Sequence, residues 1–197
     1  MRGPAYTSSE DSALLRKALE TRKGGRFLEI GAGNGGTLVE LTKRYGLVVG
    51  TDTMMPAMAD WKDSGANFVL ADGASCIRRS AFDLVAFNPP YVPVKAEEDA
   101  TVGGGEQLEV PKAFLRDSLK VVRRGGEILF LLNNEANLDE FRRICAGKGF
   151  DLKAIVTQRV FFEELTAYSA KAIGRGGSHH QVGGAPAETS SRRHPSH

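Results

Sequence analysis

The sequence predicts an α/β fold with a mostly parallel sheet of seven strands, a C-terminal antiparallel hairpin and helices on both faces. Three observations predict it. Short apolar runs alternate with segments of helical spacing, polar residues follow several of these runs, and the last two runs are close enough to pair antiparallel. With 197 residues, 41% of them hydrophobic, the chain has room for one domain with a sizeable core.

Five segments carry signals of helices. Leucine and alanine recur at helical spacing in residues 10–22, and residues 36–45 follow a glycine-rich run and are expected to end before Gly46. Proline suits the first turn of a helix, so a short helix is expected over residues 56–62 and a longer one over 110–122. The fifth predicted helix covers residues 138–148.

Seven short runs rich in apolar and β-branched residues predict the strands. They cover residues 26–30, 47–51, 67–71, 82–87, 127–132, 150–158 and 165–172. The first five are separated by helices or long connections, which favours parallel pairing and a sheet covered on both faces. In such a sheet ligands bind beyond the carboxyl ends of the strands, so the residues after each strand are the candidate site.

The chain divides into a folded body, residues 1–173, and a tail, residues 174–197. The tail is rich in Gly, Ser, Pro and Ala, lacks an apolar period and is expected to be disordered. It also contains all four histidines, so the body should work without histidine, which disfavours Ser-His catalysis and His-ligated metals. We therefore expect no metal site.

Charge and cysteine content exclude further classes. Three of the 26 basic and one of the 24 acidic residues lie in the tail, so the body carries 23 of each sign. A neutral body lacks the basic surface of a dedicated nucleic-acid binder. The two cysteines, Cys76 and Cys145, have no metal-ligand spacing and are expected to be buried free thiols. No run reaches the roughly 18–20 apolar residues that span a bilayer, and the first residues lack the apolar core of a signal peptide, so a cytoplasmic protein is expected.

A glycine-rich loop follows the first strand. Gly31, Gly33 and Gly36 fit the fingerprint of a nucleoside-binding turn, and Asp52, at the end of the next strand, could accept hydrogen bonds from ribose hydroxyls. This pattern alone does not separate a nicotinamide enzyme from an S-adenosylmethionine enzyme. Glu29 tilts the choice, because its charge suits the ammonium of a methionyl group and would repel a pyrophosphate. Asp72, after the third strand, offers an acceptor for the adenine amino group.

Residues 88–91 read Asn-Pro-Pro-Tyr and follow the fourth strand. A planar amide or aromatic amine is a weak nucleophile, and two acceptors would hold its N–H groups as a methyl group arrives. The side-chain oxygen of Asn88 and the carbonyl of Pro89 can be these acceptors, and Tyr91 can stack on the flat group. Prolines restrict the backbone, so this clamp would be positioned in advance. The alternative is a rigid turn without a ligand, since Asn-Pro often begins turns.

The glycine loop together with Asn-Pro-Pro-Tyr resembles the class I (Rossmann-like) methyltransferases that act on planar nitrogens. Within them the chain is similar to the HemK-like glutamine methyltransferases of translation release factors, and residues 6–15 resemble the opening of their eukaryotic and archaeal branch, with Ser8 at the position usually held by proline. The resemblance covers about residues 6–172. It implies S-adenosylmethionine as the cofactor, the catalytic residues Asn88, Pro89 and Tyr91, and the cofactor contacts Ser12, Glu29, Gly31, Gly33, Asp52, Asp72, Gly73 and Asn88.

The resemblance also implies a substrate and a partner. The substrate would be the glutamine of the Gly-Gly-Gln loop in a class 1 release factor, and the partner a small zinc-binding activator protein. Residues 67–71 are a likely sheet-edge strand with an apolar run that invites strand addition, so we expect the heterodimer to form there. The alternatives are an adenine or guanine amino methyltransferase and a protein-lysine methyltransferase. A nicotinamide oxidoreductase and a binding-only protein are less favoured, because neither explains the Asn-Pro-Pro-Tyr motif together with the acidic residues.

Overall fold

The computed structural model describes residues 9–55, 63–89, 109–160 and 163–173. Along the chain the elements are α1 (Ser9–Leu19), β1 (Gly24–Ile30), α2 (Gly36–Leu41), β2 (Tyr45–Asp52), β3 (Asn67–Leu70), β4 (Phe82–Phe87), α3 (Glu109–Val121), β5 (Val122–Asn133), α4 (Leu138–Ala146), β6 (Phe150–Val160) and β7 (Glu163–Ala172). The predicted helix over 56–62, the tail over 174–197, and Pro90 and Tyr91 of the clamp lie outside the described residues.

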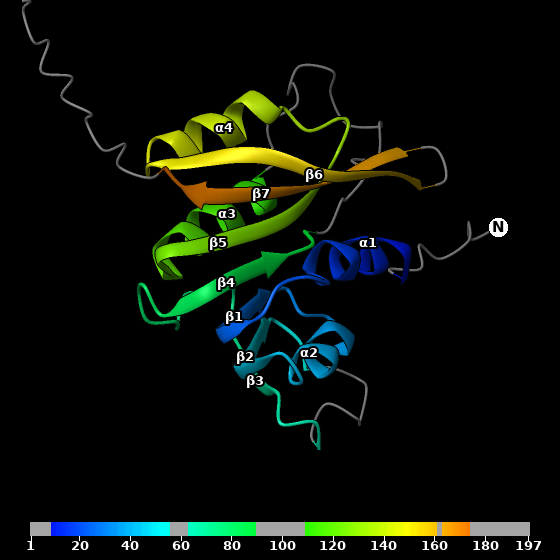
Figure 1. Ribbon diagram of the computed structural model, residues 1–197, viewed down its shortest axis with the longest axis vertical. Coiled ribbons are helices and arrows are strands. Elements are labelled where there is room, and N and C mark those ends of the chain that lie inside the picture. Colours follow the sequence, from blue (N-terminus) through cyan, green and yellow to red (C-terminus); the bar gives the residue numbers. More distant parts are fainter. Residues whose placement is uncertain (1–8, 56–62, 90–108, 161–162, 174–197) are drawn as a thin grey trace, which may run out of the picture.

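The seven strands form one sheet in the order β3-β2-β1-β4-β5-β7-β6 (Figure 1). The first five strands pair in parallel, and β7 pairs antiparallel with both β5 and β6. The predicted mostly parallel sheet with a C-terminal antiparallel hairpin is therefore confirmed. The order reverses between β1 and β4, which places the switch point of the sheet next to the glycine loop.

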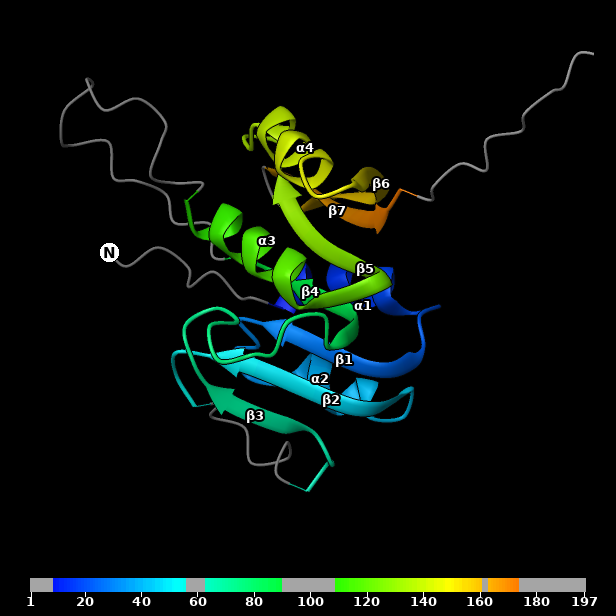
Figure 2. The same cartoon turned by 90° about the vertical axis from the view of Figure 1, so that its left-hand side faces the viewer.

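Two apolar cores lie on the two faces of the sheet. Leucines of α1 and α2 pack with Phe27 and Leu84 on one face, while Leu115 of α3 and Phe141 of α4 pack with Phe87 on the other. Figures 1 and 2 show α1 and α2 on one side of the sheet and α3 and α4 on the opposite side. Because side chains alternate along a strand, Glu29 shares the face of Phe27 and points toward α1 and α2.

Several predicted boundaries are wrong. The first helix ends at Leu19 rather than near residue 22, and β5 begins at Val122 rather than at Glu127. The second helix ends at Leu41 rather than near Tyr45, and Tyr45 and Gly46 already belong to β2. The reason is tertiary: Tyr45 pairs with Gly24 of β1 and its ring packs on Phe27, with ring centroids 5.3 Å apart. Such long-range contacts override the local helix signal.

One cysteine also differs from expectation. Cys145 lies on α4 and is buried in the core, but Cys76 is exposed in the turns after β3. Its position follows from the short β3, because the chain leaves the sheet at Leu70 and residues 72–76 lie beyond the strand end. Within the described parts of the chain, no helix is long and apolar enough to cross a membrane.

Candidate functional site

The register of the sheet brings four strand ends together. Ile30 is level with Thr51 of β2 and Phe87 of β4, and Asp52 is level with Leu70 of β3. The residues that follow these strands therefore lie in a row along the carboxyl edge, in the order of the strands β3, β2, β1 and β4. Each of these strands contributes at least one of the predicted site residues, which is the arrangement that a ligand at the switch point requires.

The glycine loop wraps over the end of β2. Gly31, Gly33 and Gly35 all have positive φ angles, of 70°, 55° and 79°, which side chains rarely adopt. The N–H groups of Gly31 and Ala32 donate to the carbonyl of Thr51 at 2.8 and 3.0 Å. Glycine is thus required by the backbone path itself, and the loop leads directly into α2.

Asp52 fixes this loop. One carboxylate oxygen accepts the N–H of Gly33 at 2.9 Å, and the other accepts the N–H of Met54 at 3.0 Å. A carboxylate has about four lone-pair sites, so these two bonds orient the group and leave capacity to accept ribose hydroxyls. The side chain is half-buried, so a nucleoside could reach it.

Glu29 lies beneath the loop and is 5% exposed. Burial raises the pKa of its carboxyl to about 8, although the Thr37 side chain and the charge of Arg16 favour the ionised form and Asp52 opposes it. Its Oε2 atom has no hydrogen-bond partner among the described residues. A buried carboxyl with spare acceptor capacity would gain from a cationic group such as an ammonium.

Two residues around Glu29 were not anticipated. Thr37 lies in the first turn of α2, and Arg16 lies one helical turn after Ser12 on α1. The spacing of Ser12 and Arg16 was a usable signal, because residues four apart share a helix face. Ser12 itself is half-buried in the first turns of α1, the helix that packs on the same side of the sheet as α2.

Asp72 and Gly73 follow β3. Asp72 is exposed and Gly73 is buried with a φ angle of 55°. The turn is held by bonds from Ser75 N–H to the Asp72 carbonyl at 3.2 Å and from Ile77 N–H to the Ala74 carbonyl at 3.0 Å. The Asp72 carboxyl therefore stands at the site edge on a structured turn.

Asn88 and Pro89 follow β4 beside the glycine loop. The side-chain oxygen of Asn88 is buried and has no hydrogen-bond partner among the described residues. Buried polar atoms are nearly always paired, so this oxygen is a candidate acceptor for a substrate N–H. Pro89 is buried, and the Phe87 ring that precedes the clamp stacks on Phe130 with centroids 4.9 Å apart.

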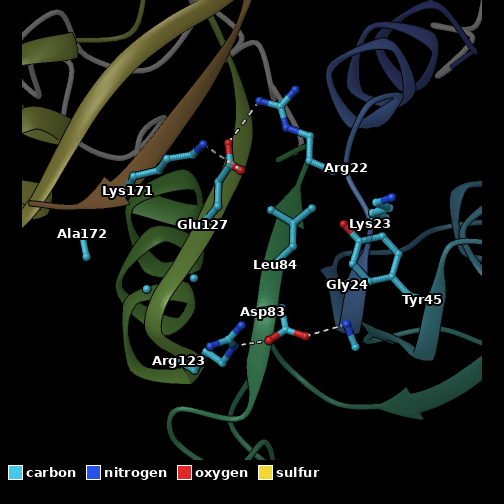
Figure 3. Close-up of a pocket in the computed structure, with 13 residues that line it drawn as sticks. Arg22, Lys23, Gly24, Tyr45, Asp83, Leu84, Arg123, Glu127, Lys171 and Ala172 are labelled. Atoms are coloured by element: carbon cyan, nitrogen blue, oxygen red, sulfur yellow. Dashed lines mark hydrogen bonds and ion pairs between the residues drawn. The ribbon is translucent and has the colours of Figure 1, made fainter. Parts of the chain in front are cut away.

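A separate pocket of about 370 Å³ lies at the opposite edge of the sheet, between the starts of β1, β4 and β5 and the end of β7 (Figure 3). Its two carboxylates already have partners. Asp83 accepts the N–H groups of Gly25 and Arg26 and pairs with Arg123.

Glu127 is equally well satisfied, because it binds Arg22 at 3.1 Å, Ser169 at 2.6 Å and Lys171 at 3.4 Å. These bonds connect the segment between α1 and β1 to β5 and β7. This pocket is therefore a structural ion-pair network, and the chemistry belongs to the carboxyl edge.

The residues at the carboxyl edge fit S-adenosylmethionine. A buried carboxyl with an unpaired oxygen suits the methionyl ammonium, a strand-end carboxylate suits the ribose, and a second strand-end acid suits the adenine amino group. The positive φ angles of the loop let its backbone approach the ligand closely.

Comparison with known proteins supports the same assignment. The profile of the family described as "Methyltransferase small domain" matches residues 8–144. A candidate protein N5-glutamine methyltransferase of Methanocaldococcus jannaschii is 27% identical over 179 residues, which cover 84% of this chain and 90% of that protein.

Solved structures agree in fold. The structure of the E. cuniculi Mtq2–Trm112 complex, responsible for methylation of the eRF1 translation termination factor, matches with a TM-score of 0.66 and 27% identity over 85% of this chain and 98% of that chain. The T. thermophilus 16S rRNA N2 G1207 methyltransferase, solved with AdoMet and guanosine, matches with a TM-score of 0.63 and 22% identity over 86% of this chain and 45% of that chain. The chain thus belongs to the methyltransferase small domain family and is an S-adenosylmethionine-dependent methyltransferase of the class I fold.

Proposed function

We propose that this protein methylates the side-chain amide of the glutamine in the Gly-Gly-Gln loop of a class 1 translation release factor. The observation that carries the proposal is the buried Asn88 oxygen, which has no partner among the described residues and stands next to the glycine loop. An amide nitrogen that donates to this oxygen would lie at the strand end where the cofactor is bound. The M. jannaschii and E. cuniculi relatives support glutamine as the acceptor.

One set of residues would bind the cofactor and another would bind the substrate. S-adenosylmethionine supplies an activated methyl group on a sulfonium. Ser12, Glu29, Gly31, Gly33, Asp52, Asp72 and Gly73 hold the cofactor, and Asn88 borders both ligands. The Asn88 oxygen and the Pro89 carbonyl accept the two N–H bonds of the glutamine amide, which orients its nitrogen and favours the pyramidal form that the new bond requires. Tyr91 stacks on the amide plane.

The same proposal includes a small zinc-binding activator subunit along β3. This strand is at one end of the sheet, and Leu70 is 60% exposed. Met54 and Met55, just after β2, are 73% and 55% exposed, and no strand of the described residues pairs with the outer side of β3. A free strand edge with adjacent apolar groups suits strand addition by a partner chain. The heterodimer would act in the cytoplasm, where release factors function.

A labelled methyl-transfer assay tests the proposal. Intact release factor and its Gly-Gly-Gln→Gly-Gly-Ala variant are incubated with the chain and labelled S-adenosylmethionine, with and without the activator. Label on the intact factor alone, increased by the activator, supports it. Equal labelling of both substrates would mean that the methyl acceptor is another residue, such as a lysine, and would contradict the proposal.

A nucleic-acid acceptor is the second candidate, because Asn-Pro-Pro-Tyr also occurs in adenine and guanine methyltransferases. The equal numbers of basic and acidic residues in the body favour the protein substrate. RNA or DNA included as competing substrate in the same assay separates the two.

A further inference from the structure

Helix α3 contacts two of the loops at the carboxyl edge, the glycine loop and the turn after β3. It begins after the clamp segment and packs on β4 and β5 (Figure 2). Phe114 and Asp117 are three residues apart on this helix and so share one face. Both point at glycine residues that are expected to contact the cofactor.

Phe114 contacts the first loop and lies beside the strand that leads to the clamp. A Cβ atom on Gly31 would lie 3.1 Å from its ring, so glycine allows the ring to pack directly on the loop backbone. The same ring makes an edge contact with Phe87, with centroids 5.9 Å apart. The position of α3 is thereby tied both to the glycine loop and to the residue before Asn88.

Asp117 contacts the second loop. Its Oδ2 atom accepts the N–H of Ala74 at 3.1 Å, and Lys120 pairs with its other oxygen at 2.7 Å. A Cβ on Gly73 would lie only 2.5 Å from Oδ2, so the carboxylate fills the space that any larger residue would need. Without this bond, the turn would be held by its own two backbone hydrogen bonds, which both lie within residues 72–77.

We propose that Asp117 is a positioning residue that holds the turn of residues 72–74, and with it the Asp72 carboxyl, against the adenine of the cofactor. The inference rests on the proposed role of Asp72. It assigns to α3 a part in selecting the base, which the sequence pattern of residues 109–121 does not reveal. Asp117 acts through the backbone of Ala74 and need not touch the cofactor.

The test measures dissociation constants by isothermal titration for S-adenosylhomocysteine and for S-inosylhomocysteine, in which a carbonyl replaces the adenine amino group. Wild-type protein should prefer the adenosyl ligand about tenfold, the usual value of one good hydrogen bond to a charged group. Asp117→Ala should weaken only the adenosyl ligand, by about 5- to 20-fold, and so abolish the preference. Asp117→Asn retains an oxygen acceptor and should restore most of it.

Two further variants sharpen the result. Asp139→Ala removes another helix aspartate, one that pairs with Arg142 on α4, and should leave both affinities unchanged. Asp117→Glu keeps the charge on α3 but displaces the oxygen, so it should lose the preference even if Asp117→Ala fails to fold. Far-UV circular dichroism checks each variant.

The outcomes separate two failures. Equal weakening of both ligands, or an unchanged preference in Asp117→Ala and Asp117→Glu, would overturn the positioning role alone. Wild-type protein that binds neither ligand would overturn both this role and the proposed function.

Discussion

Two acidic side chains at the carboxyl edge have different environments and therefore suit different contacts with the proposed ligand. Asp52 is half-buried and accepts two backbone N–H groups, whereas Glu29 is buried and keeps one oxygen without a partner among the described residues. Burial favours the neutral form of Glu29, and a cation placed beside its unpaired oxygen would favour the ionised form. Asp52 is therefore suited to accept ribose hydroxyls, and Glu29 is suited to receive a cation.

The raised pKa of Glu29 predicts a pH dependence of stability in the cofactor-free protein. The carboxyl has an ordinary pKa of 4.5 when unfolded and about 8 when folded, so between these values the folded state binds more protons. The free energy of unfolding should therefore fall as the pH rises from about 4.5 to 8. Glu29→Gln should flatten this fall, measured by urea unfolding at several pH values. If the free energy of unfolding depended on pH in the same way in both proteins, the raised pKa of Glu29 would be contradicted.

Asn88 and Asp52 should separate catalysis from cofactor binding. Asn88→Ala removes the proposed acceptor for the substrate amide, so methyl transfer should fall by at least about 100-fold, while the cofactor keeps its other contacts and its affinity changes by no more than a few fold. Asp52→Ala should instead weaken cofactor binding by about tenfold or more, because the ribose acceptor and the bond to Gly33 are both lost. Titration calorimetry and a methyl-transfer assay report the two quantities. Equal loss of cofactor affinity in Asn88→Ala would remove Asn88 from the substrate clamp.

At the scale of elements, the sequence predicts the presence of helices and strands more accurately than it predicts their boundaries. Period and composition identify every strand, but the start of β2 depends on pairing between Tyr45 and Gly24, which lie 21 positions apart. The same limit applies to the site. Residues in the loops after strands could be predicted because strand ends meet at one edge of a parallel sheet. Asp117 could not, because its partner is the backbone of a turn 43 positions away.

Gly50 illustrates how one strand residue sets the position of a helix and a loop. A Cβ at Gly50 would lie 2.4 Å from Leu38 of α2 and 2.8 Å from the Cβ of Ala32 in the glycine loop. The leucine end can rotate, but Ala32 can move only with its backbone. Gly50→Ala should therefore destabilise the protein by about 1–3 kcal/mol and also weaken cofactor binding.

The adjacent variant Val49→Ala is the control, because Val49 packs in the core on the opposite face of the sheet. It should lower the free energy of unfolding but leave cofactor affinity unchanged. If Gly50→Ala lowered the free energy of unfolding but left cofactor affinity unchanged, the inference that Gly50 positions the glycine loop would be wrong.

At the scale of the whole molecule, the two edges of the sheet differ. The β6 edge is eleven residues long and contains a register shift near Ile155, a feature that hinders further pairing. The β3 edge is four residues long and regular over its pairs with β2. The predicted edge position of this strand is confirmed, and it is the edge next to the site. A partner bound there could therefore stabilise the turn that carries Asp72.

The activator proposal can be tested through one backbone N–H. Ala71 N–H donates to the Asp52 carbonyl, so by alternation the N–H of Leu70 points away from β2, to the side of β3 on which the described residues place no strand. Leu70→Pro removes this donor, while Leu70→Ala keeps it and removes only the exposed side chain. If the activator adds a strand, Leu70→Pro should lose the complex in size-exclusion chromatography, whereas Leu70→Ala should keep it with lower affinity. Both variants should bind cofactor as wild type does, which shows that the site is intact. A stable complex with Leu70→Pro would mean that the partner binds elsewhere, because strand addition along β3 requires that hydrogen bond.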